Sequence, residues 1–258
     1  MTDKDLLYEV ENHVATITIN RETNRNSISP EAITLFHTYL DQALADEAVR
    51  VVCITGAGEK AFCSGADLAG SLGSDSDSQA VFDSYARLIS RLAVYPKPTV
   101  ARVNGYCLAG GTGFMLGCDI VVAKASAKFG TPEVNVGLFP MMIGALIFRN
   151  VPRKKAMEMI MLGEKLSADQ ALDMGLITRV APDSDFEDTV REILSTLAGK
   201  SPIGMRLGKT AFAAVDQMPL EEAVLYLGGK LAEVAATEDA REGIMAFLEK
   251  RSPQFKGK

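Results

Sequence analysis

The sequence of 258 residues lacks the marks of several protein classes. No apolar run reaches the roughly 18 residues that a membrane-spanning helix needs. The first residues, MTDKDLLYEVEN, are acidic and polar, so we expect no secretory signal peptide there. Proteins that bind nucleic acids are usually basic, whereas this chain has a net charge of −6. We therefore expect neither a membrane nor a nucleic acid as a partner.

Cysteine and histidine are also scarce. The four cysteines, Cys53, Cys63, Cys107 and Cys118, form no CxxC pair. Without an export signal, we expect them to be reduced and buried in a protein of the cytoplasm. The only two histidines, His13 and His37, are too few for a histidine-rich metal site, so we expect no bound metal.

Glycine-rich nucleotide motifs are missing, because there is no GxGxxG after the first strand and no GxxxxGK[ST]. Basic residues cluster only near the two ends, at Arg21 and Arg25 and between Lys250 and Lys258. Composition alone favours solvated surface for both clusters. A local site for an anionic ligand is the alternative.

What the sequence does contain is an apolar fraction of 47%, enough for a large core, and a regular order of elements. Ser29 is a candidate N-cap for a helix that begins at Pro30. Buried strands alternate with helices and recur at intervals of roughly 40 to 50 residues, which predicts an α/β core built as a stacked spiral. The expected strands lie at 7–10, 14–19, 49–56, 98–103, 119–125 and 176–180, and the expected helices of this part at 30–44, 81–95 and 110–118.

The C-terminal third is mainly helical. Ser167 and Thr237 are candidate N-caps there. The helices carry leucines and Phe247 that must pack on the chain's own core or on another subunit. We divide the chain into a core over residues 1–195 and a helical region over residues 196–258.

Two stretches of small residues, FCSGADL at 62–68 and NGYCLAGGTG at 104–113, each follow an apolar run. A strand that runs into a glycine-led helix leaves backbone N–H groups free, and such groups bind oxyanions. One N–H from each stretch could bracket a single carbonyl oxygen and stabilise it as it becomes an enolate. For either stretch alone, the alternative is a tight turn under close packing.

The pair, together with FGTPEVNVGL, resembles the enoyl-CoA hydratase/isomerase (crotonase) superfamily. The segments NRNSIS, LSADQALDMGLITRV and AFLEKRSPQFKGK are similar to that family as well, so the likeness covers nearly the whole chain in order. The resemblance implies a spiral of ββα turns with a C-terminal helical region that forms homotrimers or homohexamers. It also implies an acyl-CoA substrate and no separate cofactor.

The resemblance assigns the oxyanion hole to the backbone N–H groups of Ala66 and Gly110. These donors would hold the thioester oxygen of an acyl-CoA. Further contacts with CoA or the acyl chain are implied for Ser64, Leu68, Gly111 and Arg25 and, from a neighbouring subunit, for Phe247 and Lys250.

The same resemblance bears on the reaction. Hydratases of the family carry two glutamates, of which this chain keeps Glu133 and has Gly113 in place of the other. One carboxylate can move a proton between two carbons of an enolate, which favours an enoyl-CoA isomerase. Phe139, Met141 and Met142 would desolvate Glu133 and raise its pKa if they line the pocket. The alternative is that these three belong to the core and that Glu133 caps a turn.

Other functions stay open at this point. The chain could be an enoyl-CoA hydratase, or another acyl-CoA lyase or hydrolase of this superfamily, with water activated by one carboxylate. Asp75 and Asp77, in a segment of mobile composition at 69–79, are candidates for a replacement carboxylate, whereas Asp67 and Asp119 are expected to satisfy backbone N–H groups. Because of Gly113, a CoA-thioester-binding protein without catalysis is the alternative of another class.

Overall fold

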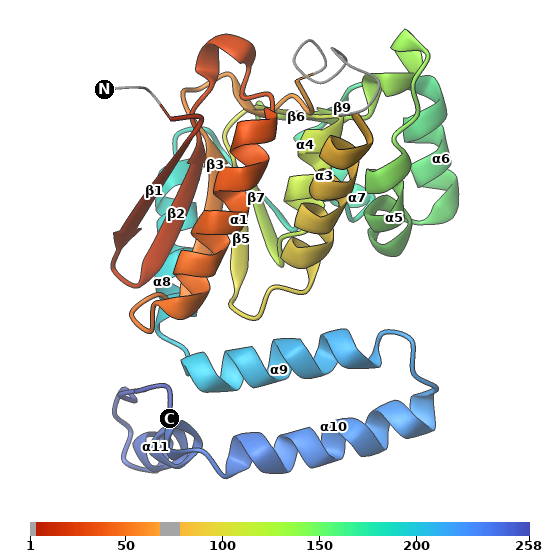
Figure 1. Ribbon diagram of the computed structural model, residues 1–258. Helices are drawn as coiled ribbons and strands as arrows, with labels where there is room; N and C mark the ends of the chain where they lie inside the picture. The colour runs from red at the N-terminus through yellow and green to blue at the C-terminus, as the bar shows by residue number, and fades with distance from the viewer. Residues whose placement is uncertain (1–3, 68–77) are drawn as a thin grey trace.

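A twisted six-stranded sheet forms the centre of the computed structural model, which describes residues 4–67 and 78–258 (Figure 1). The strand order is β1-β2-β3-β5-β7-β10. The pair β1–β2 is antiparallel and every other neighbouring pair is parallel. The strands are β1 Leu6–Glu11, β2 Val14–Ile19, β3 Val51–Gly56, β5 Thr99–Val103, β7 Ile120–Lys124 and β10 Arg179–Ala181.

A second sheet of four short strands has the order β4-β6-β8-β9. Its strands are β4 Ala61–Cys63, β6 Tyr106–Leu108, β8 Lys128–Gly130 and β9 Leu166–Ser167. The chain passes from the first sheet to the second three times, from β3 to β4, from β5 to β6 and from β7 to β8. Each passage is one turn of a spiral, so the expected α/β spiral is confirmed. The second sheet itself was not predicted, since two or three residues show no alternation to read.

Helices cover both faces of the main sheet. Val51 and Cys53 of β3 pack with Phe186 of α8, whereas Val52 and Ile54 face the larger core on the other side. Burial on both faces explains why β3 is a continuous apolar run. The helices of the spiral are α1 Pro30–Ala45, α3 Ser78–Ala93, α4 Gly110–Leu116, α5 Met141–Asn150, α6 Arg153–Leu162, α7 Ala168–Asp173 and α8 Phe186–Ala198, with short 3-10 turns η1 Glu22–Asn24 and η2 Pro132–Val136.

Local sequence signals set several helix boundaries. The side chains of Ser29, Ser167 and Thr237 each accept a hydrogen bond from a backbone N–H in the first turn, as expected of N-caps. Helix α5 was not predicted; it begins directly after Pro140, in a segment whose apolar residues were expected to line a pocket. The segment expected to be mobile, 69–79, falls almost entirely outside the described residues.

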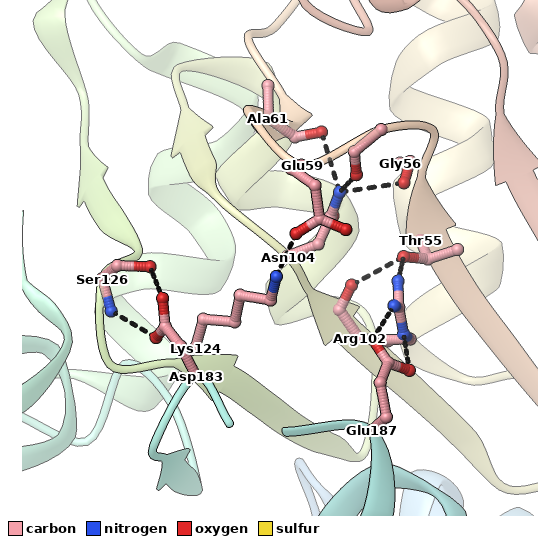
Figure 2. Close-up of polar contacts among 11 residues, drawn as sticks. Thr55, Gly56, Glu59, Ala61, Arg102, Asn104, Lys124, Ser126, Asp183 and Glu187 are labelled. Carbon is pink, nitrogen blue, oxygen red and sulfur yellow. Dashed lines mark hydrogen bonds and ion pairs between the residues drawn. The ribbon is translucent and has the colours of Figure 1, made fainter. Parts of the chain in front are cut away.

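A polar network fixes the turn that leads from the main sheet into β4 (Figure 2). The Asn104 amide donates to the carbonyl oxygens of Gly56, at 2.9 Å, and Gly58, at 2.6 Å. Nearby, Arg102 donates to the Thr55 hydroxyl at 2.9 Å and forms an ion pair with Glu187. The contacts of Thr55, Arg102 and Glu187 in Figure 2 thus tie β3, β5 and α8 together.

The C-terminal helices α9 Pro202–Val215, α10 Leu220–Ala235 and α11 Glu238–Leu248 form an arm below the spiral (Figure 1). Lys209 of α9 joins the arm to the core by donating to the Lys97 carbonyl at 2.8 Å and by an ion pair with Asp119. The arm exposes large apolar side chains, namely Phe212, Leu220, Val224, Leu225, Leu231, Ile244, Phe247 and Leu248. The boundary at 195/196 and the role of this region in assembly stay predictions.

All four cysteines are buried free thiols, as expected. Across residues 4–67 and 78–258, none of the helices combines the length and the apolar character that crossing a membrane requires. In the same residues, no group of three or more His, Cys, Asp or Glu side chains is placed to hold a metal ion.

Candidate active site

The two small-residue loops meet at Gly65 and Gly110. Gly65 has a φ of +102°, and a Cβ there would lie 2.8 Å from the Ala109 Cβ and 3.0 Å from the Gly110 nitrogen. Only glycine allows both this backbone conformation and this approach. Ile28 holds the same loop from the other side, because its N–H donates to Gly65 O at 2.8 Å and its carbonyl accepts from Asp67 N at 2.9 Å.

The N–H groups of Ala66 and Gly110 are the free donors of this junction. A Cβ on Gly110 would stand 3.4 Å from the Ala66 nitrogen, so the two backbones are in contact. Neither N–H donates to a backbone carbonyl within the described residues, and both residues line one cavity. Two N–H groups placed this way at the edge of a cavity can donate to a single oxyanion, and their use as an oxyanion hole stays a prediction.

The residue before the second donor has a strained backbone. Ala109 has φ 50° and ψ −131°, a conformation that residues with a side chain rarely adopt. Its own N–H donates to Gly130 O at 2.9 Å, which fixes the segment from the side of β8. Such strain costs about 1–3 kcal/mol and persists only where the surroundings impose it.

The cavity beside these donors has a volume of ≈ 700 Å³. Its walls come from the loops at 64–66 and 109–110, from α3, and from residues 132–143. Apolar side chains dominate the walls, including Val81, Phe82, Val136, Leu138, Phe139, Met141, Met142 and Ile143. A cavity of this kind can accept an apolar group beside the two N–H groups.

Glu133 is the carboxylate that reaches this cavity from η2. Its Oε2 is buried and has no hydrogen-bond partner among the residues that the structure describes. Burial raises the pKa of Glu133 above its ordinary value of 4.5, and a backbone hydrogen bond opposes that shift. A half-buried carboxylate with a raised pKa and with one oxygen unpartnered among the described residues is suited to exchange a proton with a ligand.

Position 113, by contrast, has no room for a side chain. Gly113 lies in α4, and a Cβ there would stand 2.6 Å from Ile143 Cγ2 and 3.3 Å from the hydroxyl oxygen of Tyr85. The helices α4 and α5 are therefore packed against each other at this glycine. A glutamate at position 113 would therefore collide with Ile143 in the present packing of the site.

The structure brings some of the predicted site residues together and leaves others apart. Ser64, Ala66, Gly110, Glu133, Phe139 and Met141 all line the cavity. Gly111 does not line it; a Cβ at Gly111 would lie 2.4 Å from Cys63 O, so this glycine serves the packing of α4 on β4. Leu68, Asp75 and Asp77 lie outside the described residues.

Three predicted CoA contacts lie away from the cavity of this chain. Arg25 is exposed at the end of η1, with a φ of 53°. Phe247 in α11 is 82% exposed and Lys250 follows that helix. Both belong to the C-terminal arm, and their contact with CoA from a neighbouring subunit stays a prediction.

Two carboxylates were expected to satisfy backbone N–H groups. Asp119 accepts from the Thr99 N–H at 2.7 Å, as predicted for a residue that satisfies backbone. Asp67 forms an ion pair with Arg21 at 2.8 Å, and its role toward backbone N–H groups stays a prediction. Arg21 therefore braces the loop that carries Ala66, although composition assigned it to solvated surface.

Sequence patterns missed two residues that build the site. Asn26 is fully buried with a φ of 56°, and its amide donates to Ala57 O at 3.0 Å and Ala61 O at 2.6 Å. Tyr85 in α3 lines the cavity and donates to Gly110 O at 2.5 Å. Both contacts join residues 25 or more positions apart, so no local pattern could indicate them.

The fold is that of the crotonase superfamily, and comparison with known proteins narrows this to a family. The model of the enoyl-CoA hydratase/isomerase family matches residues 9–258. This chain belongs to that family and is an acyl-CoA enzyme of the enoyl-CoA hydratase/isomerase type.

Its relatives include enzymes of both kinds. The chain is 37% identical over 270 residues to 1,2-epoxyphenylacetyl-CoA isomerase of Escherichia coli K12, with 98% of each protein covered. It is 35% identical over 254 residues to (E)-benzylidenesuccinyl-CoA hydratase of Thauera aromatica, covering 96% of this chain and 98% of that one. The crystal structure of enoyl-CoA hydratase from Bacillus anthracis superposes with a TM-score of 0.94 at 33% identity, covering 98% of this chain and 100% of that one.

Proposed function

We propose that this chain is an enoyl-CoA isomerase that moves one proton with one carboxylate. The observation that carries the proposal is the state of the two positions at which family hydratases carry glutamates. Glu133 is present at the cavity, and its buried Oε2 has no hydrogen-bond partner within residues 4–67 and 78–258. Gly113 replaces the other glutamate and is closed off by Ile143.

In the proposed mechanism, the thioester oxygen of a 3-enoyl-CoA accepts hydrogen bonds from the N–H groups of Ala66 and Gly110. Glu133 removes a proton from the α-carbon, and the electron pair delocalises onto the thioester oxygen as a dienolate. The same carboxyl group then delivers the proton to the γ-carbon, so the double bond moves next to the thioester. Each oxyanion donor stabilises the transition state by about 3–4 kcal/mol. The reaction needs no cofactor beyond the CoA of the substrate.

Hydration is the alternative, and the names of several relatives favour it. Adding water to a 2-enoyl-CoA requires a group to activate water and a group to deliver a proton. Among the described residues that line the cavity, the carboxylates are Glu133 and Asp83. Asp83 lies in α3 and accepts a hydrogen bond from Gln79 at 2.8 Å.

Paired substrates test the proposal. Wild type, Glu133→Gln and the matched control Asp83→Asn are assayed with trans-3-enoyl-CoA and trans-2-enoyl-CoA in ¹⁸O-labelled water. We expect turnover of the 3-enoyl substrate only, a loss of about 10²–10⁴-fold in Glu133→Gln, and little change in Asp83→Asn.

Two other results would each support a different function. Incorporation of ¹⁸O from water into a 3-hydroxyacyl product would identify a hydratase, and its loss in Asp83→Asn would name the second carboxylate. Tight binding of acyl-CoA without turnover on a broad panel would instead support a binding protein that has lost catalysis.

The proposal also covers the oligomeric state of the protein and the residues that contact CoA. We propose a homotrimer or homohexamer, supported by the large apolar side chains that α10 and α11 expose. In that assembly, Arg25 and the neighbouring subunit's copies of Phe247 and Lys250 would contact CoA. Analytical ultracentrifugation tests this, and a monomer at micromolar concentration would contradict it. A reducing, cytoplasmic environment fits the four buried free thiols.

A further inference from the structure

Tyr85 is the buried polar residue of the cavity that the proposed mechanism does not use. Its side chain extends from α3 to the beginning of α4, where the hydroxyl donates to Gly110 O at 2.5 Å. The residue is 5% exposed, and its ring packs edge-on against Phe114, with centroids 5.4 Å apart at 88°. The ring therefore has one orientation, and its hydroxyl one backbone partner.

The hydroxyl lies directly over the first turn of α4. A Cβ on Gly110 would come within 2.7 Å of the hydroxyl oxygen, and a Cβ on Gly113 within 3.3 Å. Tyr85 thus occupies the space above both glycines. Burial raises the pKa of Tyr85 well above 10, and the negative charge of Glu133 raises it further. The phenol therefore stays neutral, and its hydroxyl can donate to the Gly110 carbonyl.

The contact lies where the strained loop passes into α4, because Gly110 is the first residue of that helix. It has no side chain, and the strained Ala109 precedes it. The Ala109 N–H is anchored on Gly130 O, which fixes the segment before the Gly110 N–H. The hydrogen bond from Tyr85 fixes the segment after it.

We propose that Tyr85 is a positioning residue of the oxyanion hole, which aims the Gly110 N–H at the thioester oxygen by holding the Gly110 carbonyl. This inference rests on the proposed use of Ala66 and Gly110 as oxyanion donors. It does not depend on whether the enolate goes on to an isomer or to another product. Tyr85 acts through Gly110 and takes no proton from the substrate.

The test compares Tyr85→Phe with Tyr95→Phe. Both tyrosines are buried, and the hydroxyl of Tyr95 also donates to a backbone carbonyl, that of Leu40 at 2.7 Å. Tyr95 is not among the residues that line the cavity, so it controls for the loss of a buried hydroxyl. Each variant keeps its aromatic ring and its packing.

Three kinds of measurement are made: the kinetic constants kcat and KM for 3-enoyl-CoA, the pH at which kcat falls on the acid side, and the Kd values for a saturated acyl-CoA and for acetoacetyl-CoA, an enolisable thioester. For Tyr85→Phe we expect kcat to fall about 10- to 100-fold with KM nearly unchanged, because one oxyanion donor is misaligned. The Kd for acetoacetyl-CoA should rise about 10-fold, while the Kd for a saturated acyl-CoA stays the same. The acid-side midpoint, set by Glu133, should not move. Tyr95→Phe should match wild type in all three.

Several results would overturn the inference. Unchanged kcat and enolate affinity in Tyr85→Phe would show that the hydroxyl does not position the donor. A change in KM alone would make it a binding contact, and equal losses in both variants would make the effect one of stability. A wild type that turns over no enoyl-CoA would refute the proposed function, yet the two Kd values would still decide the role of Tyr85.

Discussion

The packing at Gly113 leads to a prediction about stability that needs no substrate. An alanine there would place its Cβ 2.6 Å from Ile143 Cγ2, whereas carbon atoms in contact normally stay about 3.5–4.0 Å apart. Ile143 is buried and β-branched, so its Cγ2 cannot turn away freely. Overpacking of this kind costs about 1–3 kcal/mol. The gain in helix propensity from Gly to Ala offsets about 1 kcal/mol of that cost.

A matched control separates the two effects. Gly144 lies in the adjacent α5, and a Cβ there would meet nothing within 4 Å. Gly144→Ala should therefore stabilise the protein by about 0.4–1 kcal/mol. Gly113→Ala should be destabilised by up to about 2 kcal/mol, and the difference between the two variants measures the clash.

Urea unfolding of the two variants, each combined with changes at Ile143, identifies the atom responsible. Leucine has no Cγ2 on a branched Cβ, so Ile143→Leu should relieve the cost of Gly113→Ala. Valine keeps that methyl group, so Ile143→Val should not relieve it. The reasoning is refuted if Gly113→Ala is as stable as Gly144→Ala, or if valine and leucine act alike in the cycle.

Three further predictions concern the same site. Burial raises the pKa of Glu133, so the ionised carboxylate destabilises the fold as pH rises above 4.5. In urea melts at pH 7, Glu133→Gln should therefore be more stable than wild type, and the difference in unfolding free energy should vanish toward pH 4. Asn26→Ala strips a buried donor from Ala61 O and puts alanine at positive φ, so calorimetry should show a loss of about 3 kcal/mol. Gly113→Glu with Ile143→Ala should hydrate 2-enoyl-CoA faster than Gly113→Gln with Ile143→Ala, if the missing carboxylate alone blocks hydration.

The fold was largely predictable because its strongest signals are local. The central strand β3 is an apolar run, β1 and β2 alternate apolar and polar residues, and Ser29, Ser167 and Thr237 mark helix starts by a hydrogen bond within one turn. The second sheet was missed because its strands are two or three residues long and are set by the spiral rather than by their own sequence. Helix α5 was missed because its apolar residues fit a pocket wall as well as a helix face.

Within the candidate site, the sequence predicted the glycines and the carboxylate, but it did not predict the residues that hold them in place. Gly65 and Gly110 belong to motifs, and the structure shows the contact that requires glycine at 65. Asn26 looked like one polar residue in a turn, although its amide holds two carbonyl oxygens more than 30 positions away. Motifs indicate which residues face a ligand, whereas the residues that hold them in place come from contacts across the fold.

Tyr85 and Gly113 show how these two kinds of residue depend on each other. On a helix of alternating apolar and polar residues, Tyr85 is indistinguishable from a core residue such as Leu88, and both are buried. Its hydroxyl can approach Gly110 only because neither position 110 nor position 113 has a side chain. A glutamate at 113 would compete with both Ile143 and this phenol for space. Glycine at 113 therefore leaves room for the hydrogen bond from Tyr85 to Gly110 O, which in our proposal holds an oxyanion donor in place.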